Sequence, residues 1–140
     1  YTELFFLDEA TALAAGHRPC ATCRRDRYDA FLMAWSAANR GGAKVLAGEV
    51  DKQLKLDRAP SARAKTDVLS NLPDGIIVKQ KNTGAYFLIR NATLFPWSFG
   101  GYGRGQPIAS VKGPFVVLTP ASTLAAIRRG YRPEIHRTAG

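Results

Sequence analysis

In the stretch GIIVKQKNTGAYFLIRNATLFPW, residues 75–97, apolar side chains gather in three short runs, IIVKQ, AYFLIR and ATLFPW. The residues KNTG separate the first two runs, and a tight corner at Arg90 and Asn91 separates the second from the third. β-Branched and aromatic residues favour strands, while short polar segments that contain glycine favour turns. The stretch therefore predicts three short strands in an antiparallel meander.

Beyond this meander the sequence predicts a loop, a fourth strand and a helix. FGGYGRGQP (residues 99–107) has four glycines in nine residues, which predicts an irregular loop. PFVVL (residues 114–118) predicts the fourth strand. The final helix is expected to have Thr119 as its N-cap and Pro120 as its first residue, and to stop at Gly130.

Before residue 58 the pattern is mainly helical. TELFF (residues 2–6) predicts a short strand, and LDEATALAAG (residues 7–16) predicts a helix with Asp8 as N-cap and Gly16 at its end. A longer helix is expected over residues 23–39, and a weaker one over residues 46–58. The longer helix carries one apolar stripe at helical spacing, formed by Tyr28, Phe31, Leu32, Trp35 and Ala38.

Both cysteines of the chain, Cys20 and Cys23, lie in the turn between the first two predicted helices. Two cysteines three residues apart can bring both sulfur atoms onto one cation, which makes this pair half of a tetrahedral zinc site. Such a site needs two further ligands; the chain has no other cysteine, and its imidazole donors are His17 and His136.

Two other interpretations of the cysteines stay open. The pair could act as a redox dithiol, because a helix N-terminus and nearby arginines lower the pKa of a thiol. A thioredoxin-like pair, however, follows a strand in a βαβ unit, and this one follows the end of a helix. The other interpretation is that both are inert structural thiols.

The segment ALAAGHRPCATC (residues 12–23) resembles the second half of the metal-binding domain of Ada-type DNA methylation-repair proteins. The resemblance covers about the first 30 residues, where strand, helix, glycine, Arg-Pro and Cys-x-x-Cys follow in the same order. It implies a zinc role for Cys20 and Cys23 and phosphate contacts by nearby arginines. That family's other two ligands are an upstream cysteine pair, one of which accepts the methyl group. Residues 1–140 contain no such pair, so the resemblance does not extend to alkyl transfer. Two alternatives stay open: these ligands precede Tyr1, or the full site has been lost.

Taken together, the patterns predict an α+β protein. We expect an N-terminal Ada-like strand, helix and Cys-x-x-Cys knuckle, a helical connector, and a small antiparallel β-sheet closed by a C-terminal helix. Residues 1–58 would form the knuckle and helical segment, residues 59–74 a linker, and residues 75–140 a small basic β-rich domain. Residues 72–133 resemble the C-terminal part of uncharacterised bacterial proteins, which implies no activity.

The charge of the chain favours a polyanionic partner. The formal net charge is +9, and all of this excess falls in residues 58–140. Strands that combine aromatic and cationic side chains are typical of single-stranded nucleic-acid sites, because bases stack on aromatic rings while cations attract phosphates. We therefore expect a nucleic-acid partner, with DNA favoured. The residues predicted to contact it are Arg18, Arg24, Arg25, Arg27, Arg104, Trp97 and Tyr102.

Other classes of protein find less support in the sequence. It contains neither a run of about 18 apolar residues, as a membrane span needs, nor a visible signal peptide, so we expect a cytoplasmic protein. It also lacks a GxxxxGK[ST] phosphate loop and a GxSxG nucleophile motif. The leading hypothesis is a non-enzymatic, zinc-dependent nucleic-acid-binding or regulatory protein. The alternatives are an enzyme of unknown reaction with a structural Cys-x-x-Cys, or a protein-interaction module.

Overall fold

The predicted meander forms the centre of the sheet. The computed structural model describes residues 6–22 and 24–140. In it β2 (Ile77–Gln80), β3 (Tyr86–Arg90) and β4 (Thr93–Ser98) pair antiparallel in sequence order. The register sets Ile77 opposite Leu88, and Leu88 opposite Phe95. The meander is thus confirmed.

Four further strands extend this centre to a seven-stranded antiparallel sheet. β7 (Phe115–Val117) pairs with the outer edge of β2, and β1 (Lys65–Thr66) pairs with β7. β5 (Gly101–Tyr102) and β6 (Gln106–Pro107) both pair with β4. The glycine-rich segment expected to be an irregular loop therefore contains two short strands, because main-chain pairing with β4 orders it.

The helices of the structure follow the expected order. They are α1 (Glu9–Ala14), α2 (Arg25–Asn39), α3 (Ala47–Asp57) and α4 (Ala121–Arg128). Asp8 caps α1 as predicted, since its carboxylate accepts the Thr11 N–H at 2.9 Å. The predicted Thr119 cap of the last helix is wrong: Pro120 is the N-cap residue, and the Thr119 hydroxyl accepts the Ile77 N–H at 3.0 Å. The Thr119 hydroxyl thus binds the first residue of β2 and does not cap α4.

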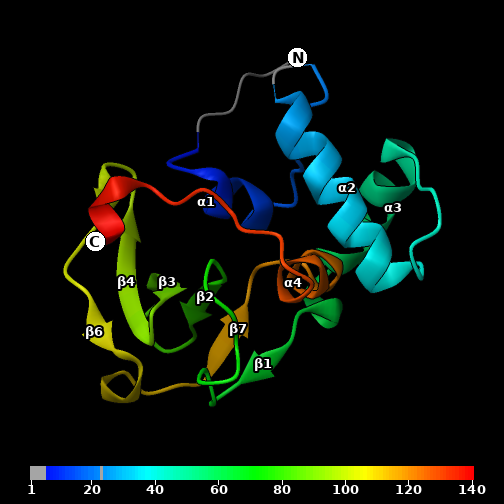
Figure 1. Cartoon of the computed structure of the whole chain (residues 1–140). Helices are drawn as coiled ribbons and strands as arrows, with labels where there is room; N and C mark the ends of the chain where they lie inside the picture. The colour runs from blue at the N-terminus through cyan, green and yellow to red at the C-terminus, as the bar shows by residue number, and fades with distance from the viewer. Residues whose placement is uncertain (1–5, 23) are drawn as a thin grey trace.

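The two faces of the sheet are covered differently. On one, which we call the helix-covered face, Val78, Phe87 and Val117 join a core with Phe31 and Trp35 of α2, so that part of the predicted apolar stripe is buried. Figure 1 shows α2, α3 and α4 grouped on one side of the molecule and the strands on the other. The opposite face, the α1 face, is covered more sparingly. There Ala10 and Ala14 of α1 pack with a smaller cluster that contains Ile77, Leu88 and Tyr102.

The segment after α4 returns to the start of the chain. It passes α1 on its way to the edge of the sheet near β4, as the orange and red ribbon of Figure 1 shows. The Ala10 N–H donates to the Glu134 carbonyl, and the Tyr102 N–H donates to the Thr138 hydroxyl at 2.8 Å. This segment therefore ties α1 to β5.

The molecule is an α+β protein, with N-terminal helices followed by an antiparallel sheet and a C-terminal helix. The division at residues 59–74 stays a prediction, yet this segment provides β1 and the buried Leu69, which joins the core of the helix-covered face. The predicted TELFF strand lies, apart from Phe6, outside the described residues, and so does Cys23. Across the described ranges, none of the helices is long and apolar enough to cross a membrane.

Candidate ligand-binding groove

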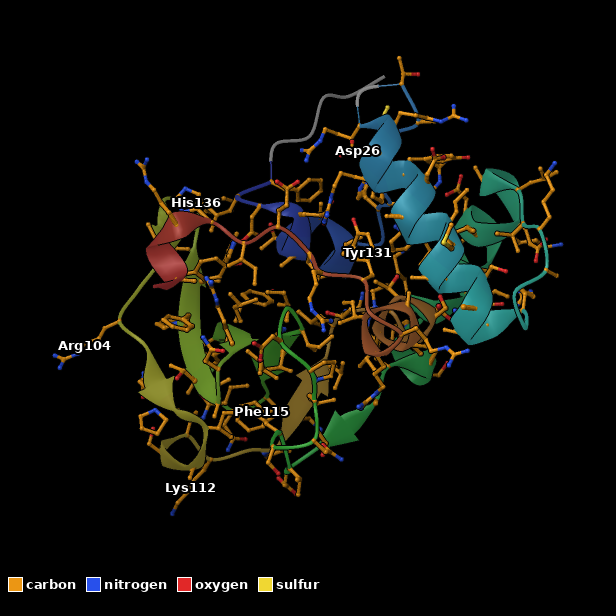
Figure 2. The ribbon with its side chains drawn as sticks, in the orientation of Figure 1. Asp26, Arg104, Lys112, Phe115, Tyr131 and His136 are labelled. Atoms are coloured by element: carbon orange, nitrogen blue, oxygen red, sulfur yellow. The ribbon has the colours of Figure 1, made fainter. Side chains whose placement is uncertain are left out.

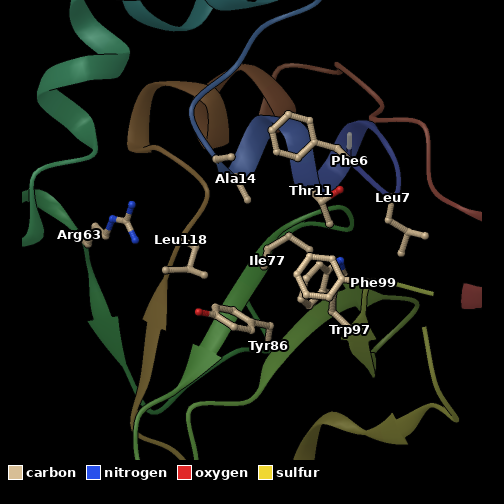
Figure 3. A pocket seen from close by; sticks show the side chains of 11 residues that line it. Phe6, Leu7, Thr11, Ala14, Arg63, Ile77, Tyr86, Trp97, Phe99 and Leu118 are labelled. Atoms are coloured by element: carbon tan, nitrogen blue, oxygen red, sulfur yellow. The ribbon is translucent and has the colours of Figure 1, made fainter. Parts of the chain in front are cut away.

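An open groove lies between α1 and the α1 face of the sheet, with a volume of about 840 Å³. Thr11, Ala14 and Ala15 line it from α1 and its C-terminal cap, and Phe6 and Leu7 come from the segment before the helix. Ile77, Tyr86, Trp97 and Leu118 line it from the sheet and its continuation after β7, and Phe99 and Arg63 complete it. Figure 3 shows these side chains around the hollow.

Three aromatic side chains form a row along the sheet side of this groove. Because Phe87 faces the core, its strand neighbour Tyr86 must point to the opposite face. The Tyr86 and Trp97 rings lie edge to face with centroids 5.8 Å apart, and the Trp97 and Phe99 centroids are 4.8 Å apart. Tyr86 is 39% exposed and Phe99 is 91% exposed. The aromatic row of Tyr86, Trp97 and Phe99 is therefore open to a partner.

Cationic groups lie beside the aromatic row. The Lys79 ammonium lies 5.7 Å from the centroid of the Tyr86 ring. Arg63 lines the groove from the other side, just before β1, and its Nε atom is buried without a hydrogen-bond acceptor among the described residues. The Trp97 Nε1 atom is in the same situation. The groove thus combines apolar walls with a guanidinium on one side and an ammonium beside the aromatic row.

Asp8 fixes the position of α1 above the sheet. One of its carboxylate oxygens accepts the Tyr102 hydroxyl at 2.8 Å and the His136 N–H at 2.9 Å. Burial raises the pKa of Tyr102, and the nearby Asp8 carboxylate raises it further. Tyr102 was predicted to contact nucleic acid. Its ring is buried, and its hydroxyl holds α1 in place.

A second polar cluster holds the C-terminal segment against α1 and α2. Glu9 accepts hydrogen bonds from the Arg27 guanidinium and, at 3.1 Å, from the Glu134 N–H. Arg27 also donates to the Arg132 carbonyl at 2.6 Å, and Arg24 pairs with Glu134. The hydrogen bonds to Glu9 and Glu134 raise the pKa of Arg27 and of Arg24.

The arginines predicted to contact phosphate occupy two kinds of position. Arg18 donates to both carboxylate oxygens of Asp51, at 2.7 and 3.0 Å, and this raises its pKa, while Arg25 lies 3.3 Å from Asp29. Together with Arg24 and Arg27, these N-terminal arginines thus have carboxylate partners within the chain. Arg104 differs, because it projects from the loop between β5 and β6 away from the rest of the molecule (Figure 2). For all five arginines, contact with phosphate stays a prediction.

The described residues do not by themselves make up a zinc site. Cys20 is exposed, and Cys23 lies outside the described part of the chain. The His17 ring lies against Phe6, with centroids 5.0 Å apart, and His136 Nδ1 lies 2.8 Å from the Thr138 hydroxyl. Over residues 6–22 and 24–140, no three His, Cys, Asp or Glu side chains gather as a metal-binding group. A closed site needs four ligands, so zinc stays a prediction.

Sequence reasoning missed part of the groove. Trp97 was predicted as a contact residue and does line it, but Arg63 was assigned to a linker and Tyr86 was not singled out. The alternation of β3 around Phe87 could have identified Tyr86, whereas no local signal marks Arg63. Comparison with known proteins finds no family model, no curated protein and no solved structure that matches this chain.

Proposed function

We propose that this protein binds single-stranded nucleic acid, with bases received on the α1 face of the sheet. The observation that carries the proposal is the aromatic row, in which Tyr86 and Phe99 are exposed and Trp97 is half-buried. Lys79 and Arg63 lie beside it. Stacking of one base on an aromatic side chain contributes about 1–3 kcal/mol, and cations attract the backbone. The net charge of +9 adds a long-range attraction for any polyanion.

The proposed role is binding and not catalysis. The chief alternative is an enzyme of unknown reaction, and a pocket lined by a histidine and a carboxylate would favour it. His136, Asp8 and Glu9 do line a second hollow of about 600 Å³. There, however, Asp8 accepts from Tyr102 and from the His136 backbone, and Glu9 accepts from Arg27. These carboxylates hold the fold together, so the aromatic row supports binding better than this hollow supports catalysis.

Two finer parts of the proposal rest on sequence resemblance. The Ada-like segment at residues 12–23 favours DNA over RNA and a zinc-stabilised knuckle at Cys20 and Cys23. Metal analysis of the purified protein, with and without Cys20→Ala, tests the knuckle separately. Binding at the groove requires no metal ligand.

Fluorescence anisotropy with a labelled oligothymidylate of about twelve nucleotides tests the proposal at low salt. We expect measurable affinity that falls steeply as salt rises, because phosphate contacts release counterions. The double variant Tyr86→Ala/Trp97→Ala should weaken binding at least about tenfold, which corresponds to the loss of one stacked base. Met33→Ala changes an exposed side chain on α2 and should bind as the wild type does.

Three results would overturn the proposal. The first is the absence of affinity for DNA or RNA at low salt. The second is a double variant that folds, as its circular dichroism shows, and binds as tightly as the wild type. A preference for duplex over single strand would also contradict it, since bases within a duplex are already stacked on one another.

A further inference from the structure

The groove contains a cation, Arg63, whose environment differs from that of two other half-buried arginines, Arg18 and Arg27. Arg18 and Arg27, which are also half-buried, each donate to a carboxylate within the molecule. Arg63 is half-buried as well, yet its Nε is buried with neither a carboxylate nor a carbonyl to accept its hydrogen among the residues that the structure describes. The side chain lines the groove, and a guanidinium that has no carboxylate partner among the described residues can pair with a bound anion.

Arg63 and the aromatic row lie on different sides of the same groove. Figure 3 shows Arg63 on one side and Trp97 with Phe99 on the other, while the apolar side chains of Ile77 and Leu118 lie between them. Tyr86 lies along this path and directs its hydroxyl toward the Arg63 side. A ligand that fits the groove is therefore flat and apolar at one end and anionic at the other.

The size and donor pattern of the groove narrow the ligand class. A volume of about 840 Å³ falls in the range of sites for molecules of drug size. The guanidinium of an arginine matches a phosphate with two parallel hydrogen bonds.

We propose that the groove holds one nucleotide unit, with the base on the aromatic row and its phosphate on Arg63. This inference rests on the proposed function and deepens it, because it assigns an orientation to the bound strand. Arg63 thus distinguishes a nucleotide from a nucleoside, while the aromatic row binds the base of either.

Titration with thymidine monophosphate and with thymidine separates these two contributions. Tryptophan fluorescence is the readout, since Trp97 lines the groove whereas Trp35, the other tryptophan, is fully buried in the core. The wild type should bind the monophosphate at least about tenfold more tightly than the nucleoside, as a charge-assisted contact implies. Arg63→Gln should remove this preference and leave thymidine affinity unchanged.

Two further variants make the test specific. Arg137→Gln removes the same charge from an exposed residue outside the groove and should keep the wild-type preference. Arg63→Lys keeps the charge but loses the planar fork, and should retain only part of the preference. Equal preference for the monophosphate in wild type and Arg63→Gln would overturn the inference.

The remaining outcomes separate this inference from the function on which it rests. If oligothymidylate binds and Arg63→Gln does not alter the nucleotide preference, the proposed function stands and the orientation is wrong. If neither oligonucleotide nor nucleotide binds, both fail. A wild-type dimer that Phe99→Ala converts to a monomer would assign the groove to a second copy of the chain and would also overturn the inference.

Discussion

At the scale of single residues, Tyr102 shows how a side chain that looks suited to binding becomes part of the framework. It lies in a glycine-rich segment beside Trp97, and the pairing of β4 with β5 places the two opposite each other. Trp97 lines the groove, whereas Tyr102 is buried and donates to Asp8. The hydroxyl must keep its proton to donate, so this contact has a defined dependence on pH.

We expect the stability of the protein to fall as pH rises above about 10, the usual pKa of tyrosine. Burial raises the pKa of Tyr102 and of Tyr131, so at that pH the unfolded chain loses protons that the folded chain retains. Below pH 10 both states keep these protons, and the contribution is constant. Urea unfolding between pH 7 and 11 measures the effect.

Tyr102→Phe identifies the contribution of this one hydroxyl. At pH 7 the variant should be about 1–3 kcal/mol less stable, because a hydrogen bond to a carboxylate is lost. The difference from wild type should shrink above pH 10, since the variant has one raised pKa fewer. Stability curves that stay parallel across this range would contradict the assignment.

At the scale of elements, β5 is the junction between the sheet and the C-terminal segment. Gly101 begins β5 with a φ of +143°, and a Cβ atom there would lie 2.9 Å from the Thr138 hydroxyl oxygen. This close approach lets Thr138 accept the Tyr102 N–H. A side chain at residue 101 would therefore separate the last residues from β5.

Gly101→Ala should destabilise the protein by about 1–3 kcal/mol, because both the backbone conformation and the contact with Thr138 oppose a side chain. Thermal unfolding gives the change. Gly100→Ala is the matched control, since a Cβ atom at that position meets no atom within 4 Å, and it should have little effect. Equal melting temperatures for the two variants would mean that the close approach does not matter for stability.

At the scale of the whole molecule, one core joins the segments that the sequence assigned to separate domains. Trp35 of α2, Leu69 of the predicted linker and Phe87 of β3 belong to the same buried cluster. Segments that share a core lose their packing together. The molecule is thus expected to unfold in one cooperative step.

The two tryptophans test this expectation, since Trp35 reports on the helices and Trp97 on the sheet. The urea transition of Trp97→Phe, followed through Trp35 fluorescence, should coincide with that seen by far-ultraviolet circular dichroism. Leu69→Ala should move both signals by the same amount, about 2–5 kcal/mol. Two separated transitions would instead support independent units on either side of residues 59–74.

The sequence predicted features that depend on contacts between residues close together in the chain, and missed features that depend on distant contacts. Asp8 marks the start of α1 and Gly16 follows its end, and both act through residues only a few positions away. The meander follows from short strand-forming runs separated by short turns. β5 and β6 could not be predicted, because their pairing with β4 outweighs the glycine content. Thr119 was misassigned as a helix cap because its hydroxyl accepts a hydrogen bond from the Ile77 N–H, which is 42 residues away in the sequence. The groove could not be predicted either, because Arg63 and Trp97 are far apart in the sequence and line the same groove only in the folded chain.

The dependence of α1 on Asp8 has a consequence for the order in which a ribosome completes the molecule. The two partners that hold this helix on the sheet, Tyr102 and His136, follow Asp8 by 94 and 128 residues. At a synthesis rate of about 5–20 residues per second, the helix waits roughly 6–26 seconds for the second partner. During that interval Asp8 lacks the hydrogen bond that it later accepts from the His136 N–H. The two hydrogen bonds that Asp8 accepts from these partners can therefore be present together only after the segment that follows α4 has been synthesised.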